Sequence, residues 1–336
     1  MVFVTGGTGF LGSHLIHALL ANGKSVRALK RETSSFELFD RVLSFYNDIP
    51  ASAKNRIEWV TGDLGDVVLL ENFMHNVSEI YHAAGLVSFQ PGDKQKLMKV
   101  NIDGTANLVN AALHAGSPKF CYVSSIAALG RADDHTLINE QAVWKSTKRN
   151  SNYAVSKYGA EREVWRGMEE GLNAVVVNPS VILGPGETNS GLAKMVNVVM
   201  KGLRFYSTGT NGFVDVRDVV RVMIGLMENG IEGERFIVSE GNHSYREIFS
   251  LIAGETGKKP PMVKAGKTLS NMAWILSWLQ GKLMNQKPLI TRETAITANS
   301  GYRYDNTRIR ETLKYSFIPV NETIKQSCRF YLKQKG

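Results

Sequence analysis

The pair Tyr153 and Lys157 offers the most specific chemistry in the sequence. The two residues stand four apart in a helical pattern, so their side chains project from one face and can share a ligand. Tyrosine has an ordinary pKa of about 10, and a neighbouring ammonium group lowers that pKa toward working pH. Tyr153 can then give a proton to a carbonyl oxygen or take one from a hydroxyl.

A serine at the end of a predicted strand completes this group. The strand predicted at Lys119–Ser124 runs into Ser125, at the sheet edge that also carries the first strand's loop. A hydroxyl there can hydrogen-bond the oxygen that exchanges a proton with Tyr153 and orient it. We therefore expect Ser125, Tyr153 and Lys157 to be catalytic.

A glycine-rich loop at residues 5–12 follows the first predicted strand and opens a helix. In this order of elements Gly6 permits a tight turn, Gly9 lets the backbone approach a pyrophosphate, and Gly12 allows close helix packing. The pyrophosphate would lie on free N–H groups at the positive end of the helix. The alternative interpretation is a tight turn without a ligand. The loop residues expected to bind a dinucleotide are Gly6, Thr8, Gly9, Phe10, Leu11 and Gly12.

The end of the second predicted strand indicates which dinucleotide binds. An NAD enzyme places an acid about 20 residues after the glycines, but here Lys30 and Arg31 occupy that place. These cations can hold a 2′-phosphate, so NADP(H) is favoured, while the neighbouring Glu32 leaves NAD(H) open. Asp63 and Leu64 follow the third strand and are expected to meet the adenine, although Asp63 could instead only form a turn.

Short apolar runs alternate with helical patterns up to about residue 180, which predicts a Rossmann-type, doubly wound parallel α/β sheet. A smaller, mainly helical C-terminal lobe is expected to cover its ligand crevice. We assign 1–178 with 208–240 to the dinucleotide-binding domain, and 179–207 with 241–336 to the substrate-binding lobe. The predicted strands are Val2–Thr5, Ser25–Leu29, Ile57–Val60, Glu79–Ala83, Lys119–Ser124, Ala174–Asn178 and Arg235–Val238. The predicted helices are Leu11–Ala21, Val67–Asn76 with Asp66 as its cap, Lys94–Ala115, Tyr153–Glu170 and Leu192–Lys201.

Taken together, these motifs resemble the extended short-chain dehydrogenase/reductases, also called the NAD(P)-dependent epimerase/dehydratase superfamily. Further shared motifs are His82-Ala83-Ala84-Gly85, Asn101 and Asn178-Pro179-Ser180. Lys30 and Arg31, the stretch Tyr122–Gly130 and Asn139–Trp144 are most similar to dihydroflavonol-4-reductase-like NADP-dependent reductases.

The resemblance implies roles for individual residues. It implies that Ser125, Tyr153 and Lys157 are catalytic and that Lys157 also bonds the nicotinamide ribose. Counting back from Gly130 favours Ser125 over Ser124, and Asn101 is either structural or part of a proton relay. The residues implied to lie against the cofactor are Ala83, Ala84, Pro179 and Ser180.

Two residues of the segment Phe213–Val219 are assigned provisional roles. We expect Asp218 to cap a helix, and Arg217 is a candidate for reaching the substrate. The seven histidines lack ligand spacing, so His82 and His135 are interpreted as packing or surface residues and no metal is expected.

Composition narrows the function further. The net charge of +9 lies in the part of the chain after residue 180, yet no nucleic-acid-binding motif accompanies it. Cys121 and Cys328 form neither a disulfide framework nor a zinc site, and the N-terminus shows no targeting pattern, so we expect a cytoplasmic protein. An apolar stripe at helical spacing over 269–283 lies among lysines. We interpret it as core or pocket wall, and the alternative is a peripheral contact with an anionic membrane.

We therefore expect an NADP(H)-dependent oxidoreductase that reduces a carbonyl, or oxidises the alcohol, of a small hydrophobic substrate. The alternatives are an NAD-dependent nucleotide-sugar epimerase/dehydratase and a cofactor-sensing protein without turnover. A homodimer is also expected, in which the helices Lys94–Ala115 and Tyr153–Glu170 pair with their copies in a second subunit. Its apolar surface would come from Leu97, Val100, Leu108, Ala111, Ala112, Tyr158, Val164, Trp165 and Met168.

Overall fold

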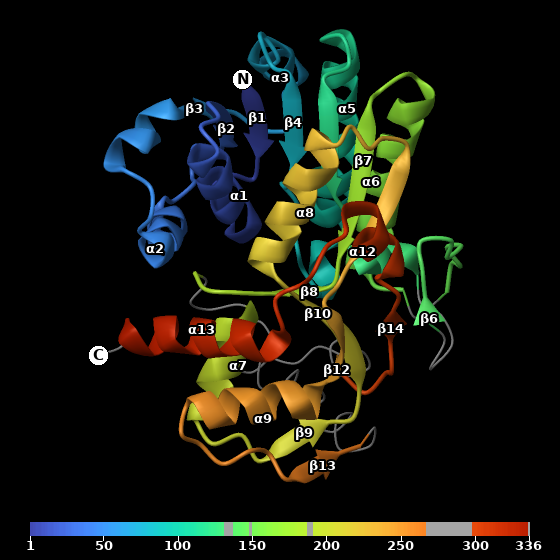
Figure 1. Ribbon diagram of the computed structural model, residues 1–336. Coiled ribbons are helices and arrows are strands. Elements are labelled where there is room, and N and C mark those ends of the chain that lie inside the picture. The colour runs from blue at the N-terminus through green and yellow to red at the C-terminus, as the bar shows by residue number, and fades with distance from the viewer. Residues whose placement is uncertain (131–136, 148–149, 187–190, 267–297, 335–336) are drawn as a thin grey trace.

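The computed structural model describes residues 1–130, 137–147, 150–186, 191–266 and 298–334. Its central element is a parallel sheet of seven strands in the order β11-β7-β5-β4-β1-β2-β3 (Figure 1). Chain order reverses beside β1, so the switch point for a ligand lies at the carboxyl ends of β1 and β4. The strands are β1 (Val2–Thr5), β2 (Val26–Lys30), β3 (Ile57–Thr61), β4 (Glu79–His82), β5 (Lys119–Val123), β7 (Ala174–Pro179) and β11 (Glu234–Val238).

Helices cover both faces of this sheet (Figure 1). On one face α1 (Phe10–Ala21) and α8 (Val216–Glu228) bury Leu15 and Val219 against the strands. On the other face α3 (Val67–Phe73), α5 (Gly104–His114) and α6 (Asn152–Glu169) do the same. The central strands are buried from both sides, which explains why their sequences are continuous apolar runs rather than alternating ones.

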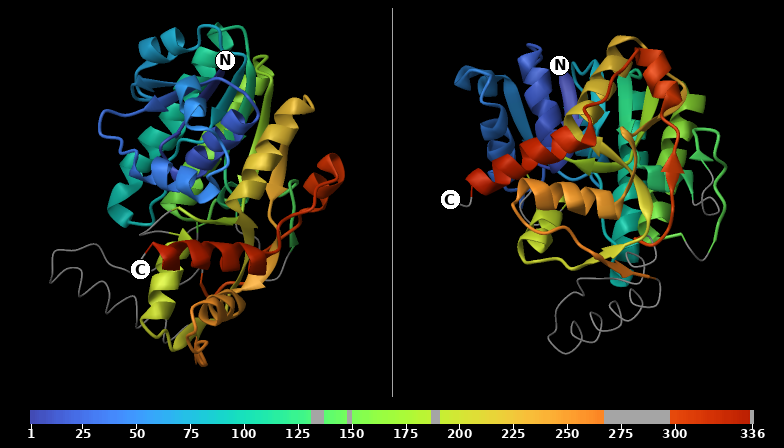
Figure 2. Two further views of the ribbon diagram at one scale, coloured as in Figure 1. Left: turned by 60° about the vertical axis from the view of Figure 1, so that its left-hand side comes forward. Right: turned by 60° about the horizontal axis from the view of Figure 1, so that its bottom comes forward.

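A second group of elements packs below the carboxyl ends of the strands (Figures 1 and 2). Its core joins Leu192, Phe213, Ile252 and Ile324. The short strands form three small sheets, β12-β10-β8, β13-β9 and β14-β6. The strands are β6 (Leu137–Ile138), β8 (Val181–Leu183), β9 (Phe205–Ser207), β10 (Thr210–Asp215), β12 (Gly241–Ser244), β13 (Val263–Ala265) and β14 (Arg303–Tyr304). The helices are α7 (Gly191–Met200), α9 (Tyr245–Glu255), α12 (Thr307–Leu313) and α13 (Val320–Lys333).

The predicted strands and helices of the sheet agree with the structure within three residues at each end. The predicted cap of α3 is confirmed, since the Asp66 Oδ1 accepts a hydrogen bond of 3.1 Å from the Leu69 N–H. The helix predicted over Lys94–Ala115 is interrupted, because α4 (Lys94–Leu97) continues through a π-helical turn at Met98–Asp103 into α5. Such turns concentrate at functional sites, and Asn101 lies in this one.

The elements that were not predicted include α2 (Glu37–Tyr46), a short 3₁₀ turn at Ala51–Arg56 and most of the short strands of the three small sheets. The predicted apolar stripe at 269–283 and the residue His135 lie outside the described part of the chain. Among the described residues, no helix has both the length and the apolar character needed to cross a membrane. Nor does that part of the chain bring three or more His, Cys, Asp or Glu side chains together as metal ligands.

Candidate active site

The glycine loop brings three chain segments into close contact. Gly6 has a φ of +73°, and a Cβ there would lie 2.7 Å from the backbone nitrogen of Ala84. A Cβ on Gly12 would lie 2.0 Å from the Gly6 carbonyl oxygen, closer than any real contact. Glycine at these positions therefore lets β1, the start of α1 and the segment after β4 meet, so Ala83 and Ala84 lie directly against the glycine loop.

The amino end of α1 is suited to an anion. The helix starts at Phe10 after Gly9, and no side chain caps its first turn. Its first N–H groups are without helical acceptors, and the helix dipole makes them a favourable site for a phosphate. This is the arrangement that a pyrophosphate requires, and the loop contains no acid that would repel one.

Two buried polar atoms without hydrogen-bond partners among the described residues lie at the carboxyl end of β7 and directly after it. The Asn178 Oδ1 and the Ser180 Oγ are buried and have no hydrogen-bond partner in the described part of the molecule. Buried polar atoms are normally paired, so atoms of this kind indicate polar groups supplied by a ligand. The carboxamide of a nicotinamide can both donate and accept hydrogen bonds, and the site therefore fits the polar end of such a cofactor.

The two adjacent serines at the end of β5 have different hydrogen-bond partners in the structure. The Ser124 Oγ donates a hydrogen bond of 2.5 Å to the buried carboxylate of Glu161, so Ser124 has a structural role. Burial raises the pKa of Tyr153, and a hydrogen bond with the Ser125 hydroxyl partly opposes this rise. Ser125, the residue predicted to share a ligand oxygen with Tyr153, is therefore the serine that lies against it.

Lys157 is held by groups other than Tyr153. Its Nζ donates to the Tyr122 hydroxyl at 2.8 Å and to the Val123 carbonyl at 2.7 Å, and the residue is only 4% exposed. Burial lowers the pKa of Lys157 to about 7, although the nearby Glu161 carboxylate opposes this shift. Burial raises the pKa of Tyr153, so the expected lowering of this pKa depends on Lys157 together with the positive charge of an oxidised nicotinamide.

Glu161 is a site residue that the sequence analysis missed. Its carboxylate accepts hydrogen bonds from Ser124, from the Asn178 Nδ2 at 2.8 Å and from the Arg235 Nη1 at 3.0 Å. This buried group therefore connects α6 to the ends of β5 and β7 and to the start of β11. The spacing of four residues from Lys157 places Glu161 on the same helix face and was the available signal.

The structure gives Asn101 a clear structural role. Its Oδ1 accepts from the Leu86 N–H at 2.7 Å, and its Nδ2 donates to the Leu86 carbonyl at 3.0 Å and to the Ser156 Oγ at 2.9 Å. The side-chain amide of Asn101 therefore uses its oxygen as an acceptor and its NH₂ group as a donor of two hydrogen bonds. Asn101 clamps the loop after β4 onto α6, which favours the structural alternative over a proton relay.

Another buried network connects β1 with this clamp. His82 hydrogen-bonds Thr5 at 2.7 Å and Thr105 at 2.9 Å, and the Thr5 hydroxyl also accepts from the Ala84 N–H. Burial lowers the pKa of His82 to about 3, so its imidazole is neutral. The predicted packing role of His82 is consistent with this complete burial.

The residues expected near the adenosine lie where β2 and β3 end. Lys30 ends β2 and is partly exposed, and the next residue, Arg31, is exposed. The Asp63 Oδ1 accepts a hydrogen bond of 2.9 Å from the Gly65 N–H. Asp63 therefore does form a turn, and its contact with the adenine stays a prediction. Leu64 is 8% exposed and packs in the core beneath this edge.

At the start of α8 one prediction is wrong and another stays a prediction. Arg217, the candidate for reaching the substrate, makes two side-chain hydrogen bonds to Asp215, of 2.9 and 2.6 Å, and a third to Gln326. The residue that caps α8 is Asp215, whereas Asp218 accepts hydrogen bonds from the Tyr315 hydroxyl and the Ile318 N–H. Both residues attach the C-terminal segment to the sheet domain.

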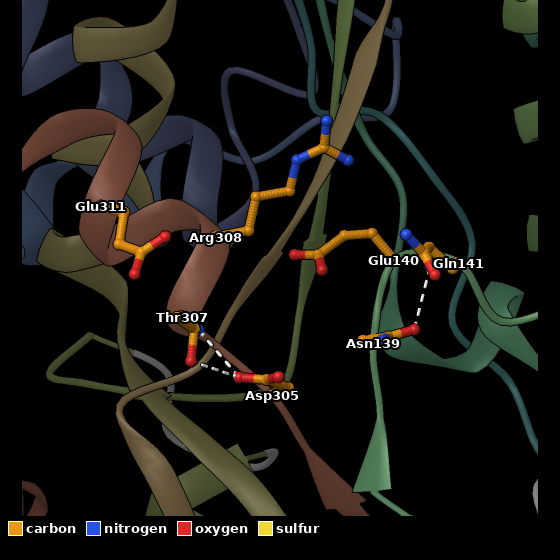
Figure 3. A pocket seen from close by; sticks show the side chains of 7 residues that line it. All are labelled: Asn139, Glu140, Gln141, Asp305, Thr307, Arg308 and Glu311. Atoms are coloured by element: carbon orange, nitrogen blue, oxygen red, sulfur yellow. Dashed lines mark hydrogen bonds between the residues drawn. The ribbon is translucent and has the colours of Figure 1, made fainter.

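A surface pocket lies away from these residues, between the start of α12 and the segment after β6 (Figure 3). Some of its polar side chains already have partners, since the Thr307 hydroxyl hydrogen-bonds Asp305 and Arg308 pairs with Glu234, which lies outside the pocket. None of the residues assigned to the cofactor or to catalysis lines it. The lining residues are Asn139, Glu140, Gln141, Asp305, Thr307, Arg308 and Glu311.

Comparison with known proteins identifies the class. Residues 2–239 match the model of the NAD dependent epimerase/dehydratase family. The chain therefore belongs to this family, with the extended short-chain dehydrogenase/reductase fold, and is an NAD(P)-dependent oxidoreductase.

Individual relatives and solved structures agree with this assignment. Sterol demethylase protein B of Methylococcus capsulatus is 30% identical over 314 residues, 92% of each chain. A putative dihydroflavonol 4-reductase of Synechocystis is 32% identical over 269 residues, 77% of this chain and 73% of the relative. The crystal structure of gox2253 has a TM-score of 0.81 at 28% identity and covers 99% of this chain and 98% of its own. The dTDP-glucose 4,6-dehydratase of Streptomyces venezuelae, with NAD bound, shares the fold at 20% identity and a TM-score of 0.78, covering 100% of this chain and 98% of its own.

Proposed function

We propose that this protein is an NADP(H)-dependent reductase of a hydrophobic ketone or aldehyde, or equally a dehydrogenase of the corresponding alcohol. The arrangement of Ser125, Tyr153 and Lys157 beside the glycine loop carries the proposal. The bound cofactor would supply or accept the hydride. Within the chain, Ser125 orients the substrate oxygen, Tyr153 exchanges a proton with it, and Lys157 positions the cofactor and balances charge.

Apolar groups near Tyr153 support a hydrophobic substrate. The Phe89 ring lies edge to face with the Tyr153 ring, with 5.6 Å between centroids, and Phe89 is 39% exposed. Val87, on the same loop, is 64% exposed, and the Asn101 clamp at Leu86 fixes the loop's start. Names of relatives that include dihydroflavonol, ceramide and cinnamoyl-CoA reductases agree with bulky apolar substrates.

The proposed cofactor is NADP(H), held by Gly6, Thr8, Gly9, Phe10, Leu11 and Gly12 at the pyrophosphate, with Pro179 and Ser180 bordering the nicotinamide. Support for the phosphate form comes from Lys30 and Arg31, two cations at the end of β2 that form no ion pair with another described residue. We keep the proposed division into a sheet domain (1–178 with 208–240) and a covering lobe (179–207 with 241–336). The unpaired, buried Cys121 and Cys328 suit a reducing, cytoplasmic setting.

A panel of hydrophobic aldehydes and ketones tests this function. Consumption of NADPH, followed by absorbance, is expected with aryl and long-chain alkyl carbonyls but not with nucleotide sugars. Turnover of a nucleotide sugar without net NADPH consumption would instead support the second candidate, an NAD-dependent epimerase or dehydratase. That candidate rests on the family model and on the NAD-bound structures of similar fold.

The pKa of Lys157 predicts how activity depends on pH. A lysine whose pKa is lowered to about 7 carries its charge below that pH and loses it as the pH rises through it. If the ammonium is needed, kcat/KM, which reports the free enzyme, falls above about pH 7. A kcat/KM that stays constant up to about pH 9 would contradict a required ammonium with this pKa.

The proposed homodimer rests on less apolar surface than the sequence suggested. Leu97, Leu108, Ala111, Ala112 and Val164 are all buried within a single chain, so they cannot supply a surface for a second one. Half-buried side chains remain on these helices, at Val100, Tyr158, Trp165 and Met168. The dimer proposal therefore depends mainly on Trp165, whose Nε1 lies 3.4 Å from the Glu161 Oε1.

Light scattering tests the dimer. At micromolar concentration we expect twice the chain mass of 37.2 kDa, and we expect Trp165→Glu to shift it toward one chain, because a charge would be buried in the interface. Trp165→Phe is the matched control and should remain dimeric. A wild-type protein with the mass of one chain would overturn the proposal.

A further inference from the structure

At the bottom of the described part of the molecule in Figure 1, on the side away from the seven-stranded sheet, lies a two-stranded parallel ribbon of β9 and β13 (Figures 1 and 2). The chain reaches it twice, through residues 191–209 with α7 and β9, and through 256–266 with β13. We call these two segments together the basic tip. None of its residues belongs to the active site described above.

Three apolar side chains of the basic tip face solvent. Met262 is 79% exposed, and Phe205 and Val263 are each 48% exposed. Phe205 and Val263 are register partners, so they lie side by side on one face of the ribbon. Exposed large apolar groups clustered in this way mark an interaction site rather than ordinary surface.

The other face of the ribbon packs inward. Tyr206 follows Phe205 and therefore points to the opposite face, where the Arg246 guanidinium of α9 lies 5.0 Å from its ring centroid. The ribbon is thus fixed to the lobe by one face. Phe205 and Val263 are left on the outward face.

All charged side chains of the basic tip are positive. Its two segments contain six cations and no acid. All of these cations except Lys194 lie at the ribbon or in the turns that flank it, and none forms an ion pair within the described residues. The six cations are Lys194, Lys201, Arg204, Lys258, Lys259 and Lys264.

We propose that the basic tip docks on the surface of an anionic lipid bilayer. Exposed apolar side chains surrounded by cations are the combination that binds the headgroup boundary, where the apolar groups enter and the cations meet phosphates. An exposed methionine at the apex favours lipid over nucleic acid, which is bound through stacked aromatic rings and backbone phosphates. The docking surface is separate from the active site, so it places the enzyme at a membrane without changing the reaction.

Flotation with lipid vesicles tests the proposal. We expect the protein to float with phosphatidylcholine vesicles that contain about a quarter phosphatidylglycerol and to stay behind with phosphatidylcholine alone. Binding should weaken between about 0.05 and 0.5 M salt, because the charges are exposed. Each cation near an anionic surface contributes about fivefold to binding, so Lys259→Glu with Lys264→Glu should reduce it more than about tenfold.

A matched variant separates this site from overall charge. Lys96→Glu with Lys145→Glu makes the same change in charge at exposed residues elsewhere on the chain and should bind vesicles nearly as well as wild type. Met262→Ser should bind less at every salt concentration while its NADPH-dependent turnover is unchanged. The proposal is overturned if wild type does not float at low salt, if both charge variants lose binding equally, or if a DNA duplex binds the tip in preference to the vesicles.

Discussion

Replacing Tyr153 with phenylalanine is expected to reduce kcat by about 10²–10⁴-fold, the usual contribution of a general acid or base. Only the hydroxyl that hydrogen-bonds Ser125 is removed, while the ring keeps its contact with Phe89. Folding and cofactor binding should therefore be unchanged. Steady-state kinetics with a confirmed carbonyl substrate gives the test, and thermal unfolding gives the check on folding.

The neighbouring Tyr158 provides a matched control, because it lies on the same helix and its ring stacks on Trp144. Tyr158→Phe also removes one phenol hydroxyl, but from a ring outside the proposed catalytic group. It should keep near wild-type turnover. Tyr153→Phe with more than about half the wild-type rate would remove Tyr153 from the mechanism.

Replacing Arg31 with alanine is expected to weaken NADP(H) binding by about tenfold or more and to leave NAD(H) binding nearly unchanged. A charge-assisted hydrogen bond to a phosphate contributes roughly 1.5–3 kcal/mol, and only NADP(H) has the 2′-phosphate. The exposed Arg31 makes a backbone hydrogen bond to Ser34, through its N–H, which alanine retains. The substitution therefore removes the charge without disturbing the turn.

Titration of both cofactors into wild type and Arg31→Ala measures this difference, and NAD(H) serves as the control within each protein. An equal loss for the two cofactors would show that Arg31 acts on the fold of the loop or on the shared part of the cofactor. The assignment of NADP(H) would then lose its main support.

The sheet could be predicted because its elements depend on local sequence. Strands buried on both faces read as continuous apolar runs, as at Ala174–Pro179, and the α3 start was marked by its capping Asp66. The amphipathic α2 was missed because its first residues follow Phe36, which provides no capping side chain. The small strands β9 and β13 pair residues about 60 apart in sequence, and no local signal specifies such a pairing.

The residues of the candidate site could be predicted from the sequence, but the hydrogen-bond partners of these residues could not. The sequence placed Ser125, Tyr153 and Lys157 together from strand order and helix spacing. It could not show that Glu161 binds Ser124, or that Tyr122 and Val123 hold the Lys157 ammonium, because these contacts form only when β5 and α6 pack together. The same limit applies to Arg217, whose hydrogen-bond partner Gln326 lies more than a hundred residues away.

Transfer of deuteride from NADPH that carries deuterium at both C4 positions tests the central claim most directly. With a hydrophobic aldehyde that the protein reduces, mass spectrometry of the alcohol should show one deuterium at the carbinol carbon and one oxidised cofactor released for each product. Tyr153→Phe should lose this transfer in proportion to its turnover. A product without deuterium, or a protein that retains its cofactor and rearranges a nucleotide sugar, would contradict the assignment as an NADP(H)-dependent carbonyl reductase.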